Sequence, residues 1–90
     1  MASKTERDAV FAPEFRADLA YWIATDRTVA MRVLSLVDDT MGTPFAGLGK
    51  PEPLKHELAG AWSRRINIEH RLVYRVYEDR IAFLGARYHY

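Results

Sequence analysis

The sequence predicts an α+β fold in which a short N-terminal strand and a two-helix hairpin pack on a twisted antiparallel sheet. Apolar residues recur at helical spacing in the first half, strand-like runs fill the second half, and a loop rich in proline and glycine separates the halves. The 90 residues, 49% of them apolar, suffice for one core. We therefore expect a single domain over 1–90, with 1–6 as a flexible extension.

The first half predicts one strand and two helices. Residues 8–12 form a short strand candidate that ends at Pro13, which suits the first turn of a helix because no amide hydrogen is needed there. That helix is expected to end near Thr25, and a second helix is expected over 26–40, with Gly42 as its stop signal. Their apolar faces comprise Phe15, Leu19, Trp22 and Ile23, then Val29, Val33, Leu36, Val37 and Met41.

The second half predicts a loop and four antiparallel strands. The loop covers 42–53, and the strands cover 54–58, 61–68, 70–77 and 80–88, with turns at 59–60 and 78–79. Side chains alternate across a strand, so even-numbered residues from Ile66 to Val76 are expected on one face and Arg71, Val73 and Arg75 on the other. In the last strand, Ile81, Phe83, Gly85, Arg87 and His89 are expected to share a face.

Composition excludes several classes of protein. The chain has no cysteine, which excludes disulfides, thiolate zinc sites and cysteine nucleophiles. It has no apolar stretch near the length of a membrane span, and its first residues do not resemble a signal peptide, so we expect a cytoplasmic protein. The spacing of His56, His70 and His89 matches no zinc pattern, and we expect no metal and no cofactor.

Charge is distributed unevenly along the chain. Residues 1–45 contain five basic and seven acidic side chains, whereas residues 46–90 contain eight basic and five acidic ones and all three histidines. Such asymmetry is typical of a protein with an anionic partner, although a solvated basic face has the same composition.

Three residue types in the second half suit cleavage of RNA by its own 2′-hydroxyl. Glu52 lies between two prolines, Arg71 lies on an expected strand, and His89 is next to the C-terminus. A carboxylate base, a histidine acid and an arginine opposite the phosphorane supply that chemistry without a metal. The alternatives at this point are a solvated Glu52, an idle His89 and a surface ion pair of Arg71 with Glu69. A non-catalytic RNA- or ribosome-binding domain and a DNA-bound regulatory partner protein also remain open.

Several spaced motifs resemble the YoeB family of toxins, within the RelE superfamily of toxin–antitoxin systems. The resemblance covers nearly the whole chain after the first six residues. The motifs are Thr43-Pro44-Phe45, Gly47-x-Gly-Lys-Pro-Glu-Pro-Leu-Lys-His56, Trp62-Ser-Arg-Arg-Ile66, Glu69-His-Arg-Leu-Val-Tyr74 and Arg87-Tyr-His-Tyr90.

The resemblance implies a ribosome-dependent mRNA endonuclease with a microbial-RNase-like fold, neutralised by a YefM-type antitoxin. It implies a homodimer, and contact with operator DNA only through the antitoxin complex. Carried over by position, the general base is Glu52, the transition-state arginine is Arg71, and the general acid is His89 with Tyr90 beside it. Residues implied to hold phosphates or ribosomal RNA are Lys55, Arg65 and Arg87, with Lys50 and His56 as further candidates.

Overall fold

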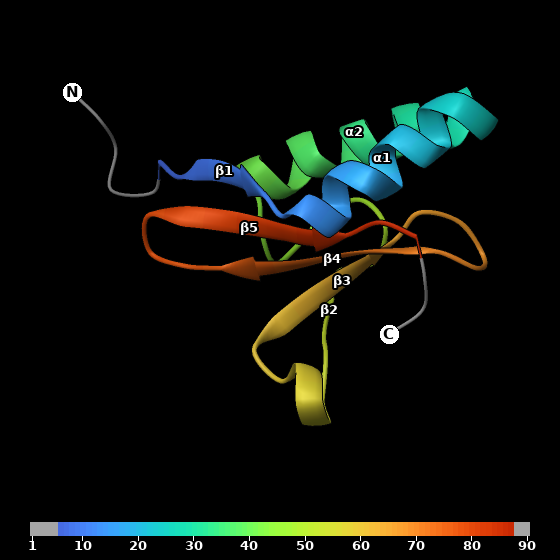
Figure 1. Cartoon of the computed structure of the whole chain (residues 1–90). Helices are drawn as coiled ribbons and strands as arrows, with labels where there is room; N and C mark the ends of the chain where they lie inside the picture. The colour runs from blue at the N-terminus through green and yellow to red at the C-terminus, as the bar shows by residue number, and fades with distance from the viewer. Residues whose placement is uncertain (1–5, 88–90) are drawn as a thin grey trace.

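The fold is two helices packed on one face of a five-stranded sheet, as a computed structural model that describes residues 6–87 shows (Figure 1). The strands lie in the order β1-β5-β4-β3-β2. This confirms the α+β prediction. The elements are β1 (Asp8–Phe11), α1 (Pro13–Thr25), α2 (Arg27–Gly42), β2 (Glu52–Pro53), the 3₁₀ turn η1 (His56–Leu58), β3 (Ala61–Arg65), β4 (Arg71–Val76) and β5 (Arg80–Gly85).

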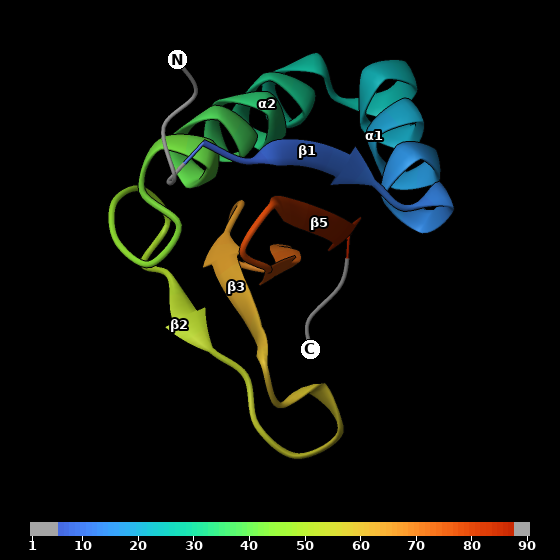
Figure 2. The same cartoon turned by 90° about the vertical axis from the view of Figure 1, so that its left-hand side faces the viewer.

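The sheet is mixed, which corrects the expectation of a purely antiparallel one. Strand β1 runs parallel to β5, with Asp8 opposite Arg80 and Phe11 opposite Phe83, and the remaining pairs are antiparallel. In Figure 2, β1 lies between the helices and β5. Pairing of the first strand with the last is a long-range contact, so no local pattern in the sequence specifies it.

The two helices follow the sequence signals closely. Pro13 occupies the first turn of α1, and Asp26 both ends α1 and caps α2, since its side chain accepts a hydrogen bond from the Val29 amide at 3.3 Å. Helix α2 continues to Gly42, two residues beyond its expected end. No helix within residues 6–87 is both long enough and apolar enough to cross a membrane.

The core lies between the helices and the sheet. Phe15 and Phe83 pack together with their ring centroids 5.9 Å apart, and Trp22, Leu36, Leu72 and Ile81 surround them. Further members are Ala30, Val33, Val37, Ile66, Tyr74 and Ala86. Leu72 and Tyr74 therefore face the helices, as the alternation of side chains in β4 predicted.

The expected strand over 54–58 is wrong. The residues that pair with β3 are Glu52 and Pro53, which lie opposite Ser63 and Trp62. The chain then turns at His56, whose φ of 59° is left-handed and incompatible with a strand, and η1 follows. The loop expected over 42–53 is correspondingly shorter, because its last two residues are strand β2.

Strand β3 ends at Arg65 rather than at residue 68. The Asn67 side chain accepts hydrogen bonds from the amides of Glu69 (2.9 Å) and His70 (2.8 Å), which closes a turn at this point. Ile68 is consequently 93% exposed instead of sharing the buried face of Ile66.

Phe83 and Gly85 were expected on the same face of the sheet, and a bulge in β5 makes this prediction wrong. Phe83 lies opposite Tyr74, whereas Gly85 lies opposite Val73, so two steps along β5 match one step along β4. Adjacent residues of β4 point to opposite faces, and Gly85 is therefore aligned with the face that carries Val73. Beyond the bulge the chain turns to the helices, since Ala86 is fully buried in the core.

Candidate functional site

Four residues form a row across the face of the sheet opposite the helices. Glu52 pairs with Ser63, Ser63 with Val73, and Val73 with Gly85. Arg71 lies two residues before Val73 in β4, so its side chain is on the same face. The row therefore joins β2, which carries the expected base, to the end of β5, which leads to the C-terminus.

Glu52 and Arg71 are in direct contact at one end of this row. The Nη1 atom of Arg71 donates to Glu52 Oε1 at 2.6 Å and to the hydroxyl of Ser63 at 3.2 Å. The Glu52 side chain is 54% exposed and that of Arg71 is 17% exposed. An anionic acceptor and a cationic donor thus meet at a surface that a large substrate can reach. Sequence reasoning missed Ser63, although its position two residues before Arg65 in the expected strand places it on this face.

The segment that leads to Glu52 is held by Arg64, whose side chain is fully buried. All five of its guanidinium hydrogens are used, and we call this set of contacts the Arg64 hub. The acceptors are Tyr74 Oη (3.2 Å), Asp39 Oδ2 (2.5 Å), and the carbonyls of Leu48 (3.1 Å), Thr43 (2.5 Å) and Ala46 (3.0 Å). The sequence indicated basic residues at 64 and 65 alike. Adjacent residues of a strand face opposite ways, and Arg64 is the one turned inward.

Two groups in the Arg64 hub have shifted pKa values. The amide of Leu48, with the Arg64 guanidinium, holds the pKa of Asp39 below its ordinary 3.8. Burial raises the pKa of Tyr74 above its ordinary 10.0, although the hydrogen bond from Arg64 opposes the shift. Asp39 is thus anionic and Tyr74 neutral at pH 7, and the Tyr74 hydroxyl donates to the Pro44 carbonyl at 2.7 Å.

Two backbone contacts connect the segment held by the Arg64 hub to Glu52. Gly49 has a φ of 78°, and its carbonyl accepts a hydrogen bond from the Arg65 amide at 2.7 Å. A Cβ at Gly49 would lie 3.0 Å from Arg64 Cβ, from the Arg65 carbonyl oxygen and from Leu36 Cδ2, so only glycine fits without displacement. Three residues later Glu52 pairs with Ser63.

The other expected binding residues occupy several places. Arg65 lies opposite Arg71 in the β3–β4 register and is exposed. Lys50, Lys55 and His56 are exposed on the chain segment on either side of Glu52. Arg87 lies instead at α1, with its guanidinium carbon 3.5 Å from the centroid of the Tyr21 ring. His89 and Tyr90 lie outside the described residues.

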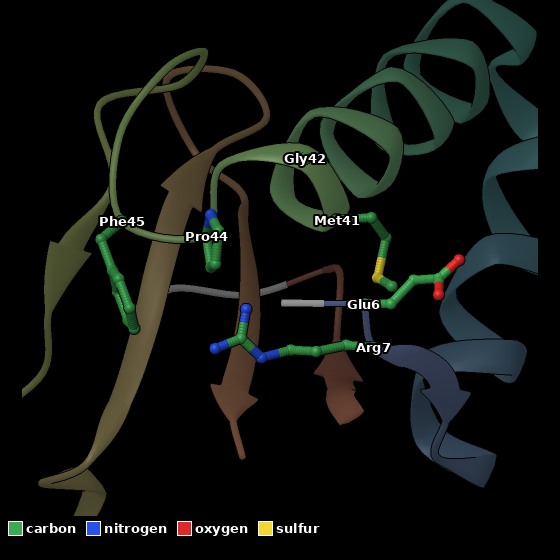
Figure 3. A pocket seen from close by; sticks show the side chains of 6 residues that line it. All are labelled: Glu6, Arg7, Met41, Gly42, Pro44 and Phe45. Carbon is green, nitrogen blue, oxygen red and sulfur yellow. The ribbon is translucent and has the colours of Figure 1, made fainter. Parts of the chain in front are cut away.

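A separate hollow of about 590 Å³ lies at another part of the surface (Figure 3). It is lined by Glu6, Arg7, Met41, Gly42, Pro44 and Phe45, and thus by neither Glu52 nor Arg71. The Glu52–Arg71 site is therefore distinct from this hollow and lies on the strand surface.

Comparisons with known proteins decide the family. The model of the family described as YoeB-like toxin of bacterial type II toxin-antitoxin system matches residues 11–90. The chain belongs to this family of toxins. It is 50% identical over 84 residues to Toxin RelK of Mycobacterium tuberculosis, covering 93% of this chain and 99% of that protein. It is 49% identical over 81 residues to Toxin YoeB of Escherichia coli K12, covering 90% and 96%.

Solved structures of YoeB toxins share the fold. A YoeB dimer from Staphylococcus aureus superposes with a TM-score of 0.86 at 36% identity, covering 94% of this chain and 99% of that one. The YoeB-YefM complex from the same organism gives a TM-score of 0.83 at 35% identity, covering 93% and 98%. The structural likeness therefore extends over nearly the whole length of both chains.

Proposed function

We propose that this YoeB-family toxin is a ribosome-dependent endonuclease that cleaves mRNA in the ribosomal A site and so inhibits translation. The observation that carries the proposal is the 2.6 Å contact of Glu52 with Arg71 on an accessible strand surface. A carboxylate and a guanidinium at hydrogen-bond distance fit both the proton and the charge that develop when a 2′-hydroxyl attacks a phosphodiester.

In the proposed reaction, the 2′-oxygen forms a bond to phosphorus while the bond from phosphorus to the 5′-oxygen breaks. Glu52 accepts the proton of the 2′-hydroxyl, and Arg71 stabilises the negative charge on the phosphorane. The His89 imidazolium donates a proton to the departing 5′-oxygen, with Tyr90 beside it. The products are a 2′,3′-cyclic phosphate and a 5′-hydroxyl. Glu52 gains the proton of the 2′-hydroxyl, and His89 loses the proton that the 5′-oxygen receives.

The number of residues between β5 and His89 supports this role. Gly85 lies opposite Val73, and Arg71 lies two residues away from Val73, about 7 Å along the strand. His89 follows Gly85 by four residues, which span up to about 14 Å of extended chain. The chain is therefore long enough to bring the imidazole to the phosphate that Arg71 holds.

The basic residues near Glu52 suit a polyanionic partner. Lys50, Lys55, His56 and Arg65 are exposed around the site, and with Arg87 they are proposed to bind mRNA phosphates or ribosomal RNA. We further propose a YefM-type antitoxin as the neutralising partner, a homodimer as the free toxin, and contact with operator DNA only through the antitoxin complex. The YoeB-YefM complex and the YoeB dimer from Staphylococcus aureus support the antitoxin partner and the homodimer. The site of action is proposed to be the cytoplasm.

The test is cleavage of a defined mRNA on programmed ribosomes by wild type, Glu52→Gln and His89→Gln. Glu57→Gln is the matched control, because Glu57 is an exposed carboxylate five residues from Glu52. We expect a cut within the A-site codon that the control retains and that Glu52→Gln and His89→Gln lower by at least 100-fold. If wild type binds ribosomes but does not cut the mRNA, the endonuclease proposal is wrong and the protein is a non-catalytic ribosome-binding domain.

A further inference from the structure

Helix α1 holds both backbone polar groups of Ala86, just after the end of β5. Asp18 Oδ2 accepts a hydrogen bond from the Ala86 amide at 2.8 Å, and Trp22 Nε1 donates to the Ala86 carbonyl oxygen at 2.8 Å. Asp18 and Trp22 are four residues apart and therefore lie on one face of the helix, one turn from each other. We call these two residues the α1 clamp.

The clamp is buried and chemically specific. Asp18 and Trp22 are each 7% exposed, and Ala86 is fully buried. A buried carboxylate is costly unless it is hydrogen-bonded, and here the acceptor is directed at a single backbone amide. The next residue, Arg87, lies over the ring of Tyr21 on the same helix. Three successive contacts from α1 thus fix the path of the chain at residues 86–87.

The clamp acts where the chain leaves the row that carries the site. Gly85 is the end of that row, opposite Val73, and the residue after it is the one that α1 holds. The terminal residues of a domain fray unless they are tied down. His89 follows Ala86 by three residues in the sequence, so holding Ala86 fixes one end of the segment that carries His89.

We propose that Asp18 and Trp22 are positioning residues for cleavage, acting through His89 by holding the backbone of Ala86. This proposal rests on the proposed endonuclease function. General acid catalysis contributes typically 10²- to 10⁴-fold and requires the acid within hydrogen-bond reach of the leaving oxygen. Loosening the clamp therefore lowers protonation of the 5′-oxygen and leaves attack by the 2′-oxygen unaffected.

The experiment compares two RNA substrates on programmed ribosomes in single turnover. One has the natural 5′-oxygen at the cleaved bond, and the other has a 5′-bridging sulfur, whose thiolate departs without a proton. The variants are Trp22→Phe, which keeps an aromatic ring but removes the N–H donor, and Asp18→Ala. Asp38→Ala is the matched control, since Asp38 is an exposed carboxylate on α2. Thermal melts establish that every variant is folded at the assay temperature.

We expect Trp22→Phe and Asp18→Ala to cleave the oxygen substrate at least 10-fold more slowly than wild type and the sulfur substrate within twofold of it. His89→Gln should show the same selectivity, and adding Trp22→Phe to His89→Gln should cause little further loss, because both changes act on one step.

Two kinds of result would overturn the proposal. Equal losses on both substrates, or no loss on the oxygen substrate, would remove the positioning role while leaving the endonuclease in place. A wild-type protein that cuts neither substrate would refute the endonuclease itself, and the role of the clamp with it.

Discussion

Asp39→Asn isolates the charge of one member of the Arg64 hub. Asp39 Oδ2 accepts from Arg64 Nη1 at 2.5 Å and from the Leu48 amide at 2.9 Å, and asparagine keeps the shape of the side chain but not its charge. A hydrogen bond to a charged group contributes about 1.5–3 kcal/mol. The Asp39 side chain is 30% exposed, so solvent screening favours the lower end, about 1.5–2 kcal/mol. At about 4–8 °C per kcal/mol for a domain of this size, the melting temperature should fall by about 6–16 °C.

The difference in unfolding free energy between wild type and Asp39→Asn should also shrink as the pH falls. The Leu48 amide and the Arg64 guanidinium lower the pKa of Asp39 in the folded state below 3.8, so the unfolded chain takes up the proton first as the pH falls. The stabilisation from the charge is complete above about pH 4 and is lost as the pH falls through the folded pKa. Asparagine has no such dependence, and wild type and variant should therefore converge in acid.

Urea unfolding followed by circular dichroism at pH 7 and pH 3 measures both effects. Asp38→Asn is the matched control, because its carboxylate is adjacent in sequence but exposed, and it should change the free energy of unfolding by less than about 0.5 kcal/mol. A difference between wild type and Asp39→Asn that stayed equal at the two pH values would refute the argument, as would equal losses for the two variants.

Three further predictions concern the hub and the site. Gly49→Ala should lower the unfolding free energy by about 1–3 kcal/mol in the same urea assay, because Gly49 has a φ of 78° and a Cβ has no room there. Gly42→Ala is the control, because Gly42 lies in the open last turn of α2, and it should be neutral or stabilising. Tyr74→Phe should be about 1–3 kcal/mol less stable than wild type at pH 7. The difference should narrow above pH 10, because the pKa of Tyr74 is raised in the folded protein and wild type alone then loses stability. A constant difference in alkaline urea titrations would contradict this. Ser63→Ala removes one of the two acceptors of Arg71 Nη1 and should slow single-turnover cleavage about 3- to 10-fold without changing the melting temperature by more than a few degrees; unchanged cleavage would exclude a role for Ser63.

Local signals predicted the helices more closely than the strands. Pro13 acts through its own backbone geometry, and α1 begins there as the sequence indicated, while Asp26, expected as the first residue of the second helix, caps it instead. Strand ends depend on partners instead. The strand expected over 54–58 failed because Glu52 and Pro53 hold the positions opposite β3, and the pairing of β1 with β5 connects the two ends of the chain.

The candidate site was predictable in its residue types but not in its arrangement. Glu52 and Arg71 are 19 residues apart, and their contact depends on β2 and β4 flanking β3 in a register that no local pattern reveals. The Arg64 hub and the α1 clamp were missed for the same reason. Asp39 and Asp18 look like solvated helix residues in the sequence, and only tertiary packing shows that each accepts from a group far along the chain.

The two networks differ in what they fix. The Arg64 hub orders residues 43–48 and, through the Gly49–Arg65 hydrogen bond, the approach to Glu52, while the α1 clamp fixes the path of the chain beyond Gly85. The approach to the proposed base and the segment that leads to the proposed acid are thus held from opposite edges of the row, by contacts that share no residue. Changes in the hub and in the clamp should therefore be separable. Asp39→Asn should affect cleavage of the oxygen and sulfur substrates alike, because both need the base, whereas Trp22→Phe should affect only the substrate that needs the acid.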